Sequence, residues 1–106
     1  MSIFKKIQNI FSNKIILILA EPLNEDTNIL NIQNYELHGN LFIPIFTSLE
    51  KLKESLNGHI LENQVIEIDG LYFCSLLIGN ESITINPDLP DEIRTTANEL
   101  KDLMKD

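Results

Sequence analysis

The side chains of this sequence best suited to acid–base chemistry near neutral pH are two histidines, His38 and His59. Each lies beside a glycine in a predicted turn, a position typical of a solvent-exposed side chain. A Ser-His-Asp set can be composed from Ser48, His59 and Asp69, but serines and carboxylates are so common in this sequence that such sets are expected by chance. We therefore predict no catalytic residue, and keep as an alternative an enzyme that uses His38 or His59 with carboxylates.

Other chemical motifs do not point to a cofactor or a metal. The sequence has no glycine-rich phosphate loop, no cysteine pair, no His-Glu-x-x-His helix and no Gly-x-Ser-x-Gly elbow. Its single cysteine, Cys74, lies in the apolar run 71–78 and cannot form an internal disulfide, which suits a reducing compartment. We expect a buried thiol that behaves as a small hydrophobic group, with no cofactor and no metal.

The charge of the chain limits its partners. Eight lysines and arginines stand against sixteen aspartates and glutamates, giving a formal net charge of −8 over 106 residues. A polyanion such as DNA, or an anionic membrane, is repelled by this charge. We expect neither nucleic acid nor membrane as a partner, and interpret the charge as a solvated surface or as attraction to a basic protein.

The N-terminal region predicts a helix followed by a buried strand. Apolar residues recur at helical spacing over 3–12, which indicates an amphipathic helix that docks on the domain's own core, with a membrane-surface helix as the alternative. The apolar run 15–20 is too short for a signal peptide or a membrane span, so it predicts a central strand that ends at Glu21-Pro22 and a cytoplasmic protein. A polar, partly ordered loop is expected over 21–34.

A hairpin is predicted next, with strands 35–38 and 41–45 joined by a turn at Gly39-Asn40, because both residue types tolerate positive φ. Pro44 has no backbone donor, so its strand should present that position to a sheet edge or to a gap in the ladder.

The segment Thr47-Ser48-Leu49-Glu50 matches a capping box, in which the Thr47 hydroxyl bonds the first helical turn and Glu50 reaches back to the cap. The helix that follows has one apolar stripe and ends at Asn57-Gly58; the stripe is Leu49, Leu52 and Leu56. Free N–H groups at such a helix start can bind an anion. Since the Glu50 carboxylate already lies at this positive end of the helix, we predict that Thr47 and Ser48 have only a structural role.

In the C-terminal half, residues 64–68 predict a strand, and Asp69-Gly70 leaves 71–78 open between a helix and a hairpin strand. We favour a helix capped by Asp69, with one buried face formed by Leu71, Cys74, Leu77 and Ile78. A strand over 82–86 and a last helix from about Pro90 to Met104 complete the chain. The order predicts one α+β domain over 1–106, with a mixed sheet of four to five strands packed against helices.

Three segments in this order resemble the N-terminal domain of the SseB family of bacterial proteins. They are Leu41–Glu50 with its Phe-Thr-Ser step, the apolar segment 71–78, and Ile83–Pro87, which closes a strand on Asn-Pro. The resemblance covers roughly residues 14–104 and implies a small α+β module of poorly defined role, without catalytic residues.

From the resemblance, the acidic charge and the lack of a catalytic set, we expect a non-enzymatic module that binds another bacterial protein, which would be basic. A purely structural or homo-oligomerising domain is the further alternative, through the strand at Pro44 or an amphipathic helix.

Overall fold

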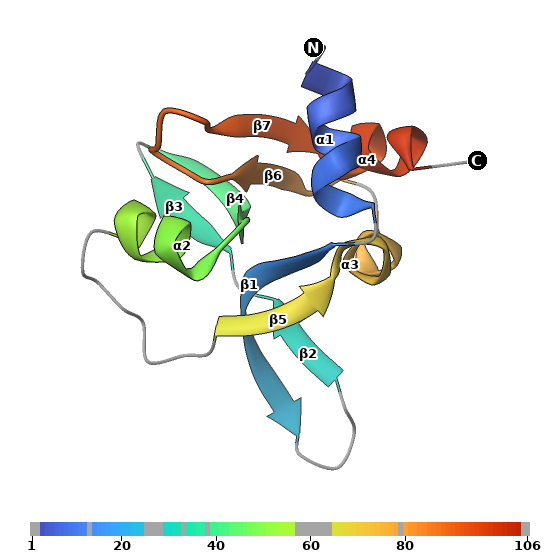
Figure 1. Cartoon of the computed structure of the whole chain (residues 1–106). Coiled ribbons are helices and arrows are strands. Elements are labelled where there is room, and N and C mark those ends of the chain that lie inside the picture. Colours follow the sequence, from blue (N-terminus) through green and yellow to red (C-terminus); the bar gives the residue numbers. More distant parts are fainter. Residues whose placement is uncertain are drawn as a thin grey trace.

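An aliphatic strand forms the centre of the molecule (Figure 1). The computed structural model describes residues 3–12, 14–24, 29–32, 34–37, 39–56, 65–78 and 80–104. In it, β1 (Ile15–Asn24) pairs antiparallel with β5 (Val65–Asp69) and with β4 (Asn40–Phe46). Both partners pair with Leu17 and Ile18, so they lie on opposite sides of β1.

The predicted end of this strand at Glu21-Pro22 is wrong. β1 continues to Asn24 and pairs antiparallel with β2 (Ile29–Ile32), with an irregular register between Pro22 and Asn24. Such an irregularity is where a sheet tolerates proline, which cannot donate to the ladder. Part of the predicted loop 21–34 is therefore a two-stranded ribbon.

Within the described part of the chain the sheet has seven strands, more than the four to five predicted, and its pairing is mixed as predicted. Its main path is β2-β1-β4-β6-β7, with β6 (Ser82–Ile85) and β7 (Ile93–Thr96), while β3 (Tyr35–Leu37) pairs with β4 and β5 pairs with β1. β4 and β6 are parallel, and the other pairs are antiparallel.

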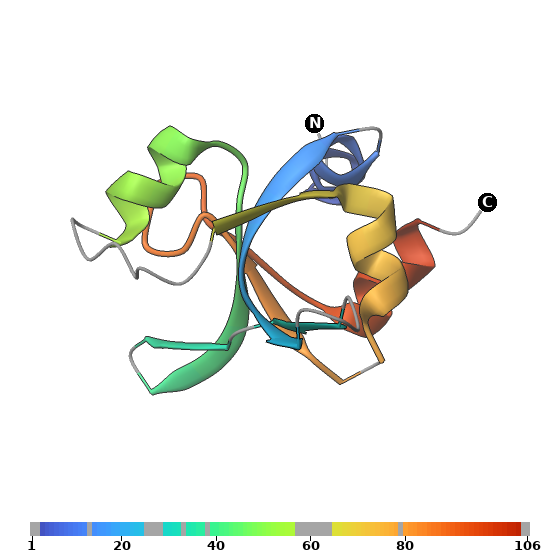
Figure 2. The same ribbon diagram turned by 90° about the horizontal axis from the view of Figure 1, so that it is seen from below.

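Helices cover both faces of the curved sheet. α1 (Ile3–Phe11), α3 (Gly70–Leu76) and α4 (Ala97–Leu103) lie on one side, and α2 (Leu49–Leu56) on the other (Figure 2). The side chains of β1 alternate accordingly. Ile16, Ile18 and Ala20 join the larger core, while Leu17 and Leu19 join the smaller core under α2. The expected α+β class, with a mixed sheet packed against helices, is confirmed.

The hairpin is confirmed, with its turn displaced by one residue. Asn40 already belongs to β4 and pairs with Leu37, so the turn does not lie at Gly39-Asn40. Gly39 has a φ of 81°, a conformation that favours glycine.

Pro44 does not lie on an edge strand, because β4 has β6 on one side and β3 and β1 on the other. The pairing with β3 ends at Phe42, however, and that with β1 begins at Ile45. Pro44 lies in this gap, as the second of the two predicted alternatives required.

The prediction of a helix from about Pro90 is wrong for the first part of that segment. Ile93–Thr96 form β7, which pairs antiparallel with β6, and α4 begins only at Ala97. The Thr96 hydroxyl caps this helix by accepting a hydrogen bond from the Glu99 N–H at 3.2 Å. The β-branched residues Ile93, Thr95 and Thr96 suit a strand, and their pairing with β6 outweighs the helix signals that precede them.

Residues 70–76 form a helix, and its cap is the predicted one. The Asp69 carboxylate accepts a hydrogen bond from the Tyr72 N–H at 2.9 Å. The predicted buried face is partly wrong, because the helix ends at Leu76 and the chain is extended from Leu77. Cys74 and Leu77 are buried with Phe73, whereas Leu71 is exposed and Ile78 is 92% exposed.

The N-terminal helix α1 docks on the core, as predicted, through Ile7 and Phe11. The Phe11 ring stacks on Phe73 with a centroid distance of 6.2 Å. Ile3 and Phe4, at the start of α1, are half exposed. Among the described residues, no helix is long and apolar enough to cross a membrane.

Candidate docking groove between α2 and β5

Ser48, not Thr47, caps α2. The Ser48 hydroxyl accepts a hydrogen bond from the Lys51 N–H at 3.1 Å, and the Ser48 carbonyl accepts one from the Leu52 N–H at 3.0 Å. The helix thus begins one residue later than the predicted capping box requires. Glu50 then occupies the second helical position instead of the third, so it does not take the role that the sequence indicated.

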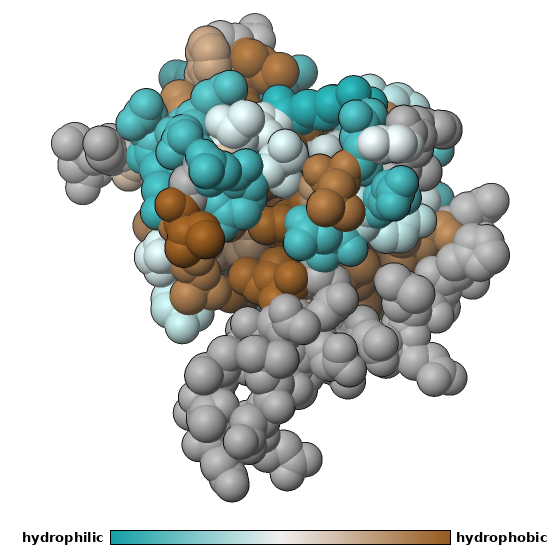
Figure 3. Space-filling model, turned by 180° about the vertical axis from the view of Figure 1, so that it is seen from behind, coloured by the Kyte–Doolittle hydropathy of each residue, from teal (hydrophilic) through white to brown (hydrophobic). Residues whose placement is uncertain are grey.

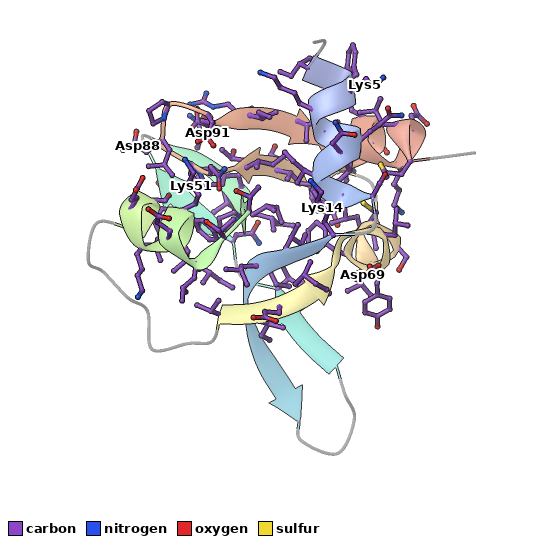
Figure 4. The ribbon with its side chains drawn as sticks, viewed as in Figure 1. Lys5, Lys14, Lys51, Asp69, Asp88 and Asp91 are labelled. Carbon is purple, nitrogen blue, oxygen red and sulfur yellow. The ribbon has the colours of Figure 1, made fainter. Side chains whose placement is uncertain are left out.

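Thr47 is instead held by Asn86, which follows β6. The Thr47 N–H donates to Asn86 Oδ1 at 3.2 Å, and Asn86 Nδ2 donates to Thr47 Oγ1 at 3.1 Å. Asn86 Nδ2 also lies 3.2 Å from Asp91 Oδ2, which pairs with Lys51 Nζ at 3.4 Å. Figure 4 shows Asp91 and Lys51 facing each other between the β6–β7 connection and α2.

Asn86 ties together the carboxyl ends of the two parallel strands. Its N–H donates to the Ile45 carbonyl at 2.7 Å, which extends the ladder between β4 and β6 by one bond. Its φ of 50° lies in the left-handed region, which asparagine tolerates better than most residues. Asn86 is 2% exposed, so this network fixes the position of Thr47 and the start of α2 from within the protein.

A hollow of about 340 Å³ opens beside this fixed junction. Its floor is formed by β1 and β5 and its wall by the first turn of α2; we call it the α2–β5 groove. The lining residues are Ile15, Leu17, Thr47, Ser48, Leu49, Val65 and Glu67.

Two large apolar side chains at the groove are open to solvent. Ile15 is 57% exposed and Leu49 is 52% exposed, although the sequence placed Leu49 on the buried stripe of α2. Leu52 and Leu56 do pack against the sheet as predicted, and Leu49 lies one turn before them, where α2 no longer covers β1. The groove can accommodate an apolar side chain from outside.

Polar groups at the groove do not form a reactive set. The Ser48 hydroxyl is engaged as a helix cap, and the Thr47 hydroxyl bonds Asn86. Glu67 supplies an exposed carboxylate on β5. This arrangement can bury apolar surface and attract a cation, but it offers no base next to a nucleophile.

Two further hollows touch Thr47. One, of about 130 Å³, lies between α1 and β1, and another, of about 410 Å³, lies between α1 and the Asn86 network. The second is lined by Lys6, Asn9, Ile10, Thr47, Asn86, Asp91 and Ile93. The recesses of this region therefore continue from the α2–β5 groove toward α1.

Another hollow, of about 210 Å³, lies over β4, β6 and β7. It contains Arg94, the single arginine of the chain, together with Ser82 and Thr84. Arg94 Nε already pairs with Glu92 Oε2 at 3.2 Å, so its charge is partly compensated within the domain.

Apolar side chains are exposed at other places as well, among them Leu41, Leu71, Tyr72 and Ile78. Figure 3 shows hydrophobic surface interspersed with hydrophilic surface on the face seen from behind. Single exposed apolar residues are normal on protein surfaces. The α2–β5 groove is of interest because it brings two of them to one hollow.

The residues that the sequence offered for catalysis are not brought together by the described structure. His38 and His59 lie outside the described residues. Ser48 and Asp69 each cap a helix, α2 and α3 respectively. Burial raises the pKa of the Cys74 thiol from 9.0 to about 11, so it stays protonated at neutral pH. Within the described part of the chain, no three His, Cys, Asp or Glu side chains are grouped so as to hold a metal ion.

Comparison with known proteins gave no match to a protein-family model, to a curated protein or to a solved structure.

Proposed function

We propose that this chain is a non-enzymatic, SseB-like module of the bacterial cytoplasm, which binds another protein through the α2–β5 groove. The observation that carries the proposal is the pair Ile15 and Leu49, both more than half exposed beside one hollow. Apolar anchors that enter pockets of this kind supply much of the binding energy of protein interfaces.

The geometry of the groove suits such a role. Its wall is fixed by the buried Asn86 network, so little conformational entropy is lost there when a partner binds. Covering the exposed halves of Ile15 and Leu49 stabilises a complex by roughly 1 kcal/mol each. The single free thiol is compatible with the reducing cytoplasm, and the charge of −8 favours a basic partner.

A co-purification from the native host tests the proposal. The tagged chain should recover a protein in stoichiometric amount, and Leu49→Glu should abolish the recovery, because it places a charge in the groove. Leu41→Glu is the matched control, since Leu41 is 62% exposed outside the groove. Recovery that survives Leu49→Glu, or that is lost equally in both variants, would remove the groove as the docking site.

A homo-oligomer through α1 is a second candidate. It is favoured by Ile3 and Phe4, which are half exposed on the helix that the sequence identified as amphipathic. Light scattering should then give a mass above that of one chain, and Phe4→Glu should restore the monomer. The strand at Pro44 does not offer such an interface, because it is interior to the sheet.

A further inference from the structure

We infer that the outer edge of β5, which pairs with no strand of the described residues, binds an extended segment of the partner as an added strand, with a basic residue of that segment opposite Glu67. This inference rests on the proposed function and specifies the form and the chemistry of the partner.

The hydrogen bonds of β5 show which of its backbone groups are unoccupied. The Gly70 N–H donates to the Lys14 carbonyl at 2.9 Å, so residue 70 is turned toward β1. In an antiparallel pair the direction of the backbone N–H and C=O groups alternates along the strand. The backbone groups of Ile66 and Ile68 therefore point toward β1, and those of Val65 and Glu67 point away from it. No described residue makes a backbone hydrogen bond to the outward groups of Val65 and Glu67.

The same two residues line the α2–β5 groove with their side chains. Glu67 pairs with Leu17 and Val65 with Leu19, so all four side chains point to the α2 side of the sheet. A strand added at β5 would thus form main-chain hydrogen bonds at the edge and place every second side chain beside the groove. Peptide recognition by strand addition combines these two features.

The charges at the edge select the side chains of the added strand. Glu67 is exposed and has no partner among the described residues, whereas Asp69 is engaged by the Tyr72 N–H. A lysine or arginine opposite Glu67 forms a favourable cross-strand pair. An apolar residue opposite Val65 extends the apolar floor of the groove.

A second copy of this chain is a poor occupant of the edge. Antiparallel pairing of two β5 strands about their centre puts one Glu67 against the other, and like charges directly opposite each other are destabilising. Each copy also carries a net charge of −8. The expected occupant is therefore a different protein with an extended segment that is both apolar and basic.

Synthetic peptides test the inference. The probe is a fluorescent peptide with the repeat Val-Thr-Lys-Thr, which places valine and lysine in turn along one face of a strand. It is compared with a peptide of the repeat Val-Thr-Glu-Thr and with the lysine peptide carrying proline in its middle. Fluorescence anisotropy measures binding, and amide hydrogen exchange followed by NMR locates it. We expect only the unbroken lysine peptide to bind, and to protect the amides of Val65 and Glu67 from exchange.

The variant Glu67→Lys should weaken binding of the lysine peptide by roughly fivefold or more and allow the glutamate peptide to bind. The matched control is Glu54→Lys on the exposed surface of α2, which changes the net charge equally and should have less effect. Binding that ignores the position of the reversed charge, or that survives the central proline, overturns the inference. A protein partner that depends on Leu49 but leaves the β5 amides unprotected refutes strand addition and leaves the proposed function intact.

Discussion

Replacing Asn86 should destabilise this fold, and two variants separate the loss of its side chain from the strain of its backbone. Asn86 combines a left-handed backbone with side-chain hydrogen bonds to Thr47 and Asp91, and it is 2% exposed. Asn86→Gly removes the side chain but keeps a residue that accepts the backbone conformation. Asn86→Ala removes the same hydrogen bonds and adds backbone strain, because a Cβ disfavours positive φ.

The expected magnitudes follow from these contacts. Each hydrogen bond contributes about 0.5–1.5 kcal/mol net, and water can partly replace the side chain at Thr47 and Asp91, which are exposed. We expect Asn86→Gly to lower the free energy of unfolding by about 2 kcal/mol. Asn86→Ala should lower it by about 1 kcal/mol more, since left-handed φ costs a residue with a Cβ roughly that much. The total free energy of unfolding of a domain of this kind is only about 5–15 kcal/mol.

Urea denaturation followed by circular dichroism measures both values, provided that the slope against urea is the same in all variants. Asn98→Ala, exposed on α4, is the control and should change the stability by less than about 0.5 kcal/mol. If the glycine variant is as stable as the wild-type protein, the side-chain network contributes nothing. If the alanine and glycine variants are equally stable, the backbone argument is wrong.

Three further predictions use the same measurement of unfolding. Ser48→Ala should lower the free energy of unfolding by about 1 kcal/mol, because it removes the cap of α2; an unchanged value would contradict that assignment. Gly70→Ala should lower it by about 1–3 kcal/mol, since the new Cβ would lie 2.8 Å from Phe11 Cα, which is backbone that cannot rotate away; a stable variant would show that α1 and α3 separate easily. Cys74 is protonated in both states below pH 9, but between pH 9 and about pH 11 only the folded state keeps the proton. The free energy of unfolding should therefore fall as the pH rises through this range, by ~1.4 kcal/mol per pH unit relative to Cys74→Ala. Identical pH profiles for the two proteins would contradict a buried thiol.

The elements that the sequence predicted best are those whose signals are local and agree with one another. Residues 15–20 are uniformly apolar, and the strand there is buried on both faces from Ile16 to Ala20. At α3 the cap signal of Asp69 was correct, although Asp69-Gly70 also allowed a hairpin turn. In both cases the decisive information lies within a few residues of the element.

The predictions from sequence are wrong where a segment distant along the chain decides the local structure. Residues 93–96 resemble the start of a helix when read with the proline and the acidic residues before them, yet they pair with β6. Thr47 and Ser48 are both good caps, and the sequence alone does not choose between them. The choice is made by Asn86, 39 positions away, which engages Thr47 and leaves Ser48 to cap the helix.

The candidate groove was not predictable from the sequence, for a related reason. Ile15, Leu49 and Val65 come from three elements, and each belongs to an apolar pattern that indicates a core position. Whether such a residue is buried depends on how far the covering helix extends over the sheet. Because α2 begins at Leu49, it covers Leu17 and Leu19 but leaves Ile15 largely exposed. The position of the cap at Ser48 thus sets where α2 begins, and with it the part of β1 that the helix leaves uncovered beside the groove.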